Sequence, residues 1–245
     1  MNRTENLRYE NQKIILQSGN KSYRAVLTLV CAKQNRIDPA DCGFLTAADL
    51  DYIRKIKNPG RRYDCILGRF AAKNAASVLL GIKMRDITIE KGVFDQPIVR
   101  NKKDSGIQVT ISHIQNYGLS VSYTRELILG ADMERSDHRA MEAVYLSAYE
   151  RRMADHMECS KAVIWTAREA LLKCLKAGIY FPQRLLELDS VRADGGTISG
   201  TYRYFRQYVF QAYDFGKRTV AIAYPSNVKC NLNLSELHLL QQQTI

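Results

Sequence analysis

Two long helical stretches, each lying between segments that alternate like strands, constrain the fold of this chain most strongly. Apolar side chains recur with helical spacing over residues 63–80 and again over residues 160–176. Each stretch is closed by a glycine, Gly81 or Gly178, as helices commonly are. The sequence therefore predicts two helices that are each packed on strands.

A short internal repeat supports this division. Ala72-Lys73-Asn74-Ala75 lies in the middle of the first helical stretch, and Ala167-Arg168-Glu169-Ala170 lies in the middle of the second. The repeat suggests two related halves, which we divide at residues 1–126 and 127–245. Strands that flank both long helices indicate the fold class α+β.

The remaining segments follow from periodicity and turn signals. Strands are predicted at 13–17, 23–31 and 127–133, alternating segments at 86–123 and 184–228, helices at 46–57 and 138–154, loops at 94–97 and 101–106, and hairpin turns at 194–196 and 214–217.

Composition narrows the class of protein. Apolar residues make up 46% of the 245 positions, no run of about 18 apolar residues suggests a membrane span, and the N-terminal residues lack the apolar stretch of a secretory signal. The six cysteines are scattered, which indicates reduced thiols and argues against a zinc site. We expect a cytoplasmic protein without a membrane partner.

The net charge of +11 favours anionic partners such as nucleic acid, acidic proteins or phosphorylated small molecules. The basic residues are spread along the chain, with no basic tail, zinc finger or aromatic RNA-binding strand. A nucleic-acid partner would rest on net charge alone, and we do not expect one.

Two acidic groups have spacings that suit a site. Asp132 and Glu134 lie two apart on a predicted strand, so both point to one side, where a bound Mg²⁺ would relieve their repulsion. Glu169 and Lys173 lie four apart on a predicted helix and share a face. From spacing alone, a polar strand end and a surface ion pair are the preferred explanations of these residues.

Two further groups could hold phosphate. Ser112 and His113 end a predicted strand ahead of a turn. Arg62, Arg69 and Lys73 share roughly one face of the first helix. A structural histidine and a solvated basic face are the alternative explanations.

Six segments, taken in their order along the chain, resemble the 4'-phosphopantetheinyl transferase superfamily. They are GRFAAK (68–73), FDQP (94–97), TISH (110–113), GADME (130–134), YE (149–150) and WTAREALLK (165–173). Within it, they are most similar to the monomeric, surfactin-synthetase-activating type. This resemblance implies an α+β fold with two pseudo-symmetric halves, each of which packs a small, mainly antiparallel sheet against a long helix. The most specific part is the strand-end Asp-x-Glu followed by the Trp-x-x-basic-Glu-Ala-x-x-Lys helix.

The resemblance implies an enzyme that transfers 4'-phosphopantetheine from coenzyme A to a serine of an apo acyl, peptidyl or polyketide carrier protein. The other product is adenosine 3',5'-bisphosphate. The implied cofactor is Mg²⁺, and the carriers implied belong to fatty-acid or secondary-metabolite synthesis. Docking of an acidic carrier would suit the positive charge of the chain.

The resemblance also implies roles for individual residues. Asp132, Glu134 and Glu169 match the metal ligands, and Glu169 matches the proposed base. Lys173 matches the lysine that steadies the diphosphate, and Glu150 matches an acidic residue near the metal.

The resemblance implies a second set of residues, which contact the nucleotide of coenzyme A. Ser112 and His113 match the phosphate-contacting pair, and His113 is a candidate catalytic residue. Gln96 and Pro97 match the loop beside the nucleotide. Arg69 or Lys73 is expected at the 3'-phosphate, with Arg62 nearby.

This sequence departs from the family pattern at several positions. Arg168 stands where the family has lysine at a phosphate contact, Gln96 replaces a basic residue, and Ile114 replaces a serine. Asn74 stands in the first half where Glu169 stands in the second, so we expect one metal site, in the cleft between the halves. A catalytically silent relative that binds coenzyme A or carrier proteins remains the alternative function.

Overall fold

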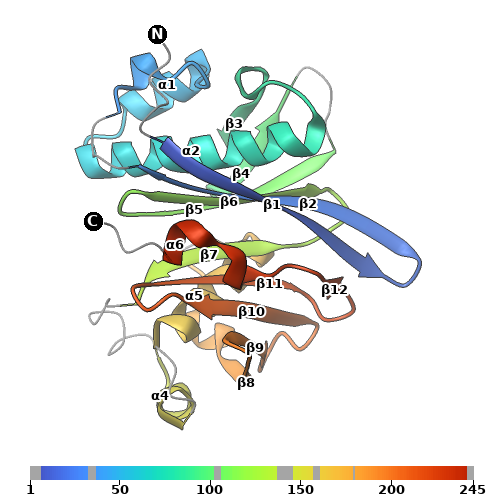
Figure 1. The fold of residues 1–245 in the computed structure, drawn as a ribbon. Coiled ribbons are helices and arrows are strands. Elements are labelled where there is room, and N and C mark those ends of the chain that lie inside the picture. Colours follow the sequence, from blue (N-terminus) through green and yellow to red (C-terminus); the bar gives the residue numbers. More distant parts are fainter. Residues whose placement is uncertain are drawn as a thin grey trace. The chain divides into compact units, whose positions relative to one another are not determined.

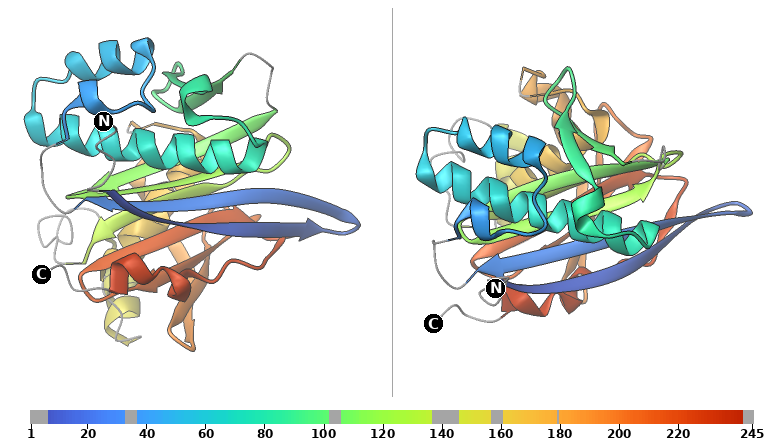
Figure 2. Two further views of the ribbon diagram at one scale, coloured as in Figure 1. Left: turned by 45° about the horizontal axis from the view of Figure 1, so that its top comes forward. Right: turned by 90° about the horizontal axis from the view of Figure 1, so that it is seen from above.

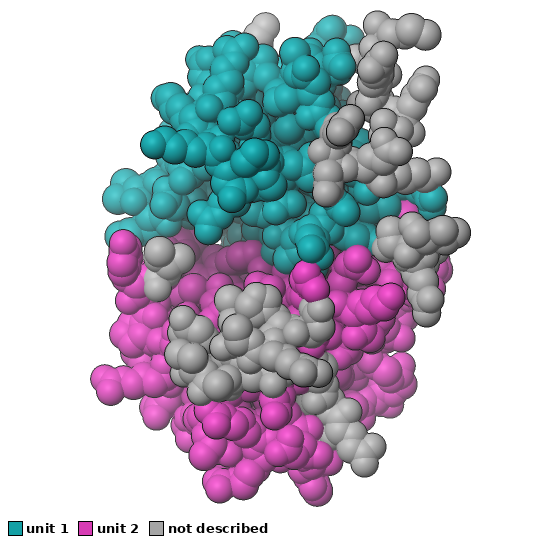
Figure 3. Space-filling model, turned by 90° about the vertical axis from the view of Figure 1, so that its left-hand side faces the viewer, with its two compact units in different colours: residues 1–16, 21–127 teal, residues 17–20, 128–245 magenta. Residues whose placement is uncertain are grey.

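The computed structural model describes residues 7–32, 37–101, 106–136, 146–156, 161–178 and 180–241. The chain divides into two compact units (Figure 3). Unit 1 comprises residues 1–16 and 21–127, and unit 2 comprises residues 17–20 and 128–245. Among the helices that the structure describes, none has the length and apolar character to cross a membrane.

Unit 1 contains an antiparallel sheet covered by one long helix. The sheet contains the neighbouring strands β1 (Leu7–Ser18), β2 (Lys21–Ala32), β6 (Tyr117–Thr124) and β5 (Ile107–Ile114), in that order. Helix α2 (Pro59–Leu80) lies along one face of this sheet and packs against β2, β5 and β6 (Figures 1 and 2).

Local sequence explains the limits of the helices in unit 1. The side chain of Asn58 accepts a hydrogen bond from the Arg61 amide (3.0 Å), so α2 begins four residues before the predicted start. It ends at Gly81, whose φ of 69° is the left-handed conformation that glycine adopts easily. Helix α1 (Ala47–Arg54) begins with a capping box between Thr46 and Asp49.

Shorter elements complete unit 1. They are η2 (Pro39–Asp41), η3 (Met84–Asp86), and the hairpin of β3 (Thr88–Lys91) and β4 (Pro97–Arg100).

Unit 2 also packs a long helix on an antiparallel sheet. The strand order is β7 (Gly130–Arg135), β11 (Arg218–Pro225), β10 (Tyr208–Asp214), β9 (Thr197–Tyr202) and β8 (Leu188–Asp194). Helix α5 (Lys161–Leu175) packs against β7, β10 and β11, and α4 (Ala148–His156) packs against α5. The remaining elements are η4 (Gln183–Leu186), β12 (Lys229–Cys230), η5 (Leu234–Glu236) and α6 (His238–Gln241).

A strand glycine lets each long helix approach its sheet closely. A Cβ atom at Gly118 of β6 would collide with the backbone of Leu67 in α2. A Cβ atom at Gly130 of β7 would collide with the backbone of Ala170 and Cys174 in α5. Any side chain at either glycine would push the helix away from the strand.

The predicted fold class is confirmed: the structure is α+β, with two sheet-based halves and one long helix on each sheet. The hairpin turns at 194–196 and 214–217 are also confirmed, with positive φ at Gly195, Gly196 and Gly216. Of the helices predicted over 138–154, the structure describes only α4. Residues 137–145, the predicted cap Ser160 and residues 102–105 lie outside the described residues.

Candidate active site

The acidic cluster of unit 2 is formed by one strand and one helix. Asp132 and Glu134 of β7 pair with Ala221 and Thr219 of β11, so they lie two positions apart on the same face of the sheet. Helix α5 packs on this strand and contributes Glu169 and Lys173. Asp132 is only 4% exposed, and the Lys173 ammonium makes an ion pair with its Oδ1 atom at 2.5 Å.

The carboxyl groups influence one another electrostatically. Burial and, to a smaller extent, the nearby charge of Asp132 raise the pKa of Glu134 to about 7, against the opposing effect of Lys173. Burial and Asp132 likewise raise the pKa of Glu169 to about 7. The Gln183 side chain donates to Glu169 Oε1 at 3.5 Å. The site therefore holds an excess of negative charge that one ammonium group does not offset.

The donor atoms of this cluster suit Mg²⁺. Among the described residues, no group of three or more His, Cys, Asp or Glu side chains is arranged so that protein ligands alone could hold a metal ion. Mg²⁺ does not require such a set, because it keeps several waters and is typically held by one or two carboxylates together with substrate phosphates. A cation here would also relieve the repulsion that raises the pKa values of Glu134 and Glu169. The residues present therefore fit the metal.

Arg168, the residue before Glu169, points into the protein interior. Its guanidinium group is 1% exposed and donates to both carboxylate oxygens of Glu150, with 2.9 Å between Nε and Oε1. Glu150 itself is fully buried. Arg168 thus neutralises a buried carboxylate, and this geometry does not present it to a phosphate as the family pattern implied.

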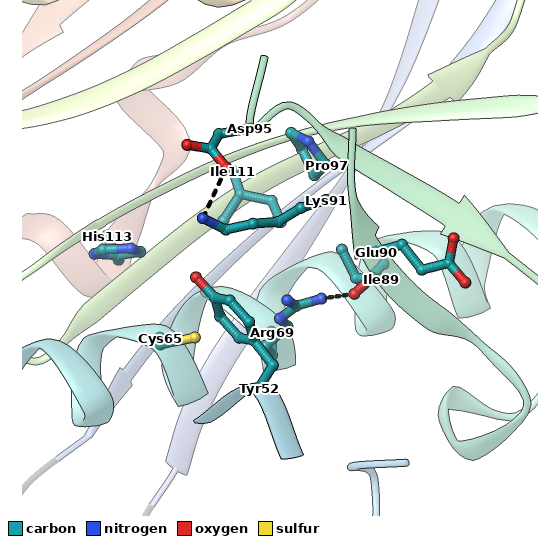
Figure 4. Close-up of a pocket in the computed structure, with 11 residues that line it drawn as sticks. Tyr52, Cys65, Arg69, Ile89, Glu90, Lys91, Asp95, Pro97, Ile111 and His113 are labelled. Atoms are coloured by element: carbon teal, nitrogen blue, oxygen red, sulfur yellow. Dashed lines mark hydrogen bonds and ion pairs between the residues drawn. The ribbon is translucent and has the colours of Figure 1, made fainter. Parts of the chain in front are cut away.

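Unit 1 contains a separate cavity of about 220 Å³, open to solvent on one side (Figure 4). Three of the predicted nucleotide contacts, Arg69, Pro97 and His113, line it. Lys91 and Tyr52 line it as well. The wall therefore contains two cations and a histidine together with the carboxylates of Glu90 and Asp95.

Arg69 is held in place on several sides. Its guanidinium group donates to the Ile89 carbonyl, lies 3.4 Å from the Asp49 carboxylate and lies 5.0 Å from the centre of the Tyr52 ring. The Lys91 ammonium pairs with Asp95 at 2.9 Å. Figure 4 shows the side chains of Arg69 and Lys91 beside the Tyr52 ring.

Two predicted basic contacts do not line this cavity. Lys73 is fully buried, pairs with Asp49 and donates to the Phe44 carbonyl at 2.9 Å. Burial lowers its pKa. Arg62 donates from Nη2 and Nε to the Ile56 carbonyl at 2.8 and 3.2 Å. Both side chains therefore support the local fold in this structure, and Arg69 is the basic residue of α2 that faces the cavity.

Ser112 and Gln96 also lie away from it. Neighbouring strand residues point to opposite faces, so Ile111 and His113 face α2 and the cavity, whereas Ser112 is buried on the other face of the sheet. The Gln96 side chain folds back and accepts from the Phe94 amide at 2.8 Å. The structure does not bring Ser112 and His113 together as a pair.

Sequence reasoning did not find Tyr52, Lys91 or Gln183. The only available signal was weak, since a lysine at a strand end and a tyrosine on a short helix occur in many proteins. Lys91 and Gln183 are positioned by the β3–β4 hairpin and by η4, which are too short to be recognised by periodicity, whereas Tyr52 lies on α1, a predicted helix.

Comparison with known proteins finds a family match within unit 2. Residues 128–224 match the model of the 4'-phosphopantetheinyl transferase superfamily. No curated protein matches the chain.

Among solved structures, the chain is similar to holo-(acyl-carrier-protein) synthase from Bacillus anthracis in complex with CoA (3',5'-ADP), with 23% identity over 33% of this chain and 75% of that chain and a TM-score of 0.31. It is similar to the Helicobacter pylori synthase in complex with coenzyme A, with 22% identity over 32% and 75% and a TM-score of 0.28. The holo-ACP-synthase from Plasmodium yoelii shares 16% identity over 48% and 96%, with a TM-score of 0.33.

Because these TM-scores are low, the assignment rests on the family match. That match includes Asp132, Glu134, Glu169 and Lys173. Residues 128–224 therefore match a domain of the 4'-phosphopantetheinyl transferase superfamily, and this match supports a 4'-phosphopantetheinyl transferase.

Proposed function

We propose that this protein transfers 4'-phosphopantetheine from coenzyme A to a serine of an apo carrier protein, with Mg²⁺ as its metal. The serine oxygen forms a bond to the β-phosphorus of the coenzyme, and the bond from that phosphorus to the bridging oxygen breaks. Adenosine 3',5'-bisphosphate leaves with the bridging oxygen, and the serine proton passes to a carboxylate of the protein.

The observation that carries this proposal is the acidic cluster of Asp132, Glu134 and Glu169 beside Lys173. We propose these three carboxylates as the groups that would hold Mg²⁺. When bound, the metal supplies charge neutralisation for phosphate oxygens. A binding protein for coenzyme A would gain nothing from a cluster of negative charge facing a negative ligand.

Lys173 and Glu169 have complementary roles in this proposal. The Lys173 ammonium, 28% exposed at its side chain and anchored by Asp132, is available to offset charge on the diphosphate. Glu169, whose pKa responds to the nearby Asp132 and Lys173, is the group proposed to accept the serine proton at its carboxylate. The hydrogen bond from Gln183 orients that carboxylate.

The cavity of unit 1 is the proposed site for a phosphate group of the nucleotide. Arg69 and Lys91 supply fixed positive charge, and His113 and Pro97 complete the wall. Gln96, Arg62 and Lys73 were also expected to contact the nucleotide, and contacts from them would require a rearrangement of the bonds described above. Ser112, the fourth expected contact, is buried on the face of the sheet opposite His113.

Finer features of the function are part of the same proposal. The order of the segments between residues 61 and 178 supports a monomeric enzyme of the surfactin-synthetase-activating type. A cytoplasmic location would give it coenzyme A and carriers of fatty-acid or secondary-metabolite synthesis. The positive net charge would favour docking of acidic carriers.

Mass spectrometry tests the proposal directly. Purified protein is incubated with coenzyme A, Mg²⁺ and a panel of apo acyl, peptidyl and polyketide carriers. We expect at least one carrier to gain the mass of one phosphopantetheine, and the gain to disappear when its acceptor serine is replaced by alanine. Binding of coenzyme A without a mass gain on any carrier would instead support a catalytically silent relative.

A further inference from the structure

Glu150 links three elements of unit 2 from a position without solvent access. Its Oε1 atom accepts from Arg168 Nε of α5 at 2.9 Å and from the Leu188 amide at the start of β8 at 3.0 Å. Its Oε2 atom accepts from the Ser147 amide at 3.1 Å, just before α4. One carboxylate therefore ties together the start of α4, the middle of α5 and the start of β8.

A second acidic residue extends these contacts toward the surface. Glu187 accepts from the Ser147 hydroxyl at 2.6 Å and from Arg203 Nη1 at 2.6 Å. The Arg203 guanidinium lies 4.6 Å from the centre of the Tyr149 ring. These polar contacts support Ser147, which donates its amide to Glu150, and Glu187, which precedes Leu188 in the chain.

The network reaches Glu169 from two directions. Arg168 is its immediate neighbour in α5. Leu188 lies just beyond η4, whose Gln183 donates a hydrogen bond to the Glu169 carboxylate. Both the backbone that carries Glu169 and the segment that orients its carboxylate are therefore attached to Glu150.

Stability alone gives a weak reason for such an arrangement. Removing two charges from water costs about as much as their mutual attraction returns, and well-packed neutral residues often replace a buried ion pair without loss. Groups behind a metal ligand, by contrast, commonly change metal affinity or activity by about 10–100-fold when they are altered.

We propose that the buried Glu150–Arg168 pair is a positioning device for Glu169, and that it sets metal affinity and turnover through the geometry of α5 and of the η4–β8 segment. The inference rests on the proposed function, in which Glu169 is a metal ligand and accepts the serine proton. Neither Glu150 nor Arg168 touches the substrate in this proposal.

The test is a variant that removes both charges together. Glu150→Gln with Arg168→Met leaves no unpaired buried charge, so the protein is expected to fold. We expect Mn²⁺ affinity, measured by electron paramagnetic resonance, to fall about tenfold or more and kcat to fall about 10–100-fold, with KM for coenzyme A within about threefold of wild type. A folded double variant with wild-type Mn²⁺ affinity and kcat would overturn the inference.

Two further variants keep the test decisive. Arg168→Lys retains a cation beside Glu150 and is expected to recover most of the Mn²⁺ affinity. Should the double variant not fold, Glu150→Asp, which keeps the charge but shortens the side chain, is expected to lower Mn²⁺ affinity; wild-type affinity in a folded Glu150→Asp protein would then contradict the inference.

Tyr202→Phe is the matched control. It removes a buried hydrogen bond of 2.8 Å from the Tyr202 hydroxyl to the Ala167 carbonyl, next to Arg168 in α5, but not the link to Glu150. It is expected to lower thermal stability without changing Mn²⁺ affinity. Failure of the proposed function would appear as wild-type protein that modifies no carrier, and the Mn²⁺ comparison between variants would still be measurable.

Discussion

The long helix of each unit contributes a buried basic residue to an ion pair, but the residue that follows it differs between the units. In unit 1, Lys73 of α2 is buried against Asp49, the third residue of the short helix that Thr46 caps. In unit 2, Arg168 of α5 is buried against Glu150, which exchanges hydrogen bonds with Ser147 in the same capping pattern. The internal sequence repeat therefore corresponds to a repeated buried ion pair.

The next residue along each helix differs. Asn74 shares a buried hydrogen bond with the Thr28 hydroxyl of β2 (3.2 Å), and Asn11 contacts the same hydroxyl. Glu169 instead lies near enough to Asp132 for that charge to raise its pKa. In both units, the buried ion pair that they share carries no net charge. Unit 2 differs from unit 1 in the three carboxylates on β7 and α5.

The largest expected effect distinguishes the carboxylates of unit 2 from Asn74 of unit 1. Asp132→Ala and Glu169→Ala should each lower transfer by about 10²–10³-fold or more while leaving the fold intact, because each removes a proposed ligand of the metal that would neutralise charge in the transition state. Asn74→Ala, the unit 1 counterpart, should change transfer by less than about threefold. Single-turnover carrier modification and circular dichroism measure both properties, and substantial turnover in either acidic variant would refute the metal site.

Unit 1 is expected to affect substrate binding instead. Arg69→Met removes the fixed cation from the cavity wall and should raise KM for coenzyme A by about tenfold, with a small effect on kcat. Dephospho-coenzyme A, which lacks the 3'-phosphate, should show no such increase if the cavity binds that group. Equal increases for both substrates would assign the cavity to a different part of the nucleotide.

The pKa values of unit 2 predict a specific pH dependence. The folded pKa of Glu134 and Glu169 is about 7, above the ordinary value of 4.5, so between these pH values the folded state holds more protons than the unfolded state. Their contribution to stability is therefore present at low pH and is lost as pH rises toward and through about 7. Without metal, we expect Tm to fall by several degrees from pH 5.5 to 7.5 through these groups.

Mg²⁺ competes with these protons, so its stabilising effect should grow over the same pH interval. Thermal unfolding of the wild type and of Glu134→Gln, with and without Mg²⁺, measures how much of this Mg²⁺ stabilisation depends on the Glu134 carboxylate. A Mg²⁺ effect that shrinks as pH rises would contradict the assignment of these carboxylates as ligands.

The smallest expected effect concerns the carrier. Raising NaCl from 50 to 300 mM should increase KM for an acidic carrier by several-fold and KM for coenzyme A by less, because exposed charges are screened more than groups bound in a pocket. Steady-state kinetics with each substrate varied in turn measures this difference. A carrier KM that does not respond to salt would exclude electrostatic steering.

The sequence predicted the framework well because the framework depends on periodicity. The two long helices, the alternating strands and the hairpin turns at Gly195–Gly196 and Gly216 all have local signals. The start of α2 was placed too late, since the predicted helix relied on apolar spacing and missed the cap at Asn58.

The candidate site was only partly predictable, for a physical reason. Spacing on a strand or helix places Asp132 with Glu134 and Glu169 with Lys173, but it does not reveal which basic residues point inward. Lys73 and Arg168 looked like phosphate contacts and are buried ion-pair partners, because Asp49 and Glu150 come from other helices. Lys91 and Gln183 were missed because short elements position them.

The most direct test of this account is the number of metal ions that the chain binds. Mn²⁺ titration in the presence of coenzyme A should give one ion per chain for the wild type and for Asn74→Ala, and no measurable binding at the same concentrations for Asp132→Asn. Two ions per chain, or one ion retained by Asp132→Asn, would contradict the claim that the carboxylates of unit 2 form the single metal site.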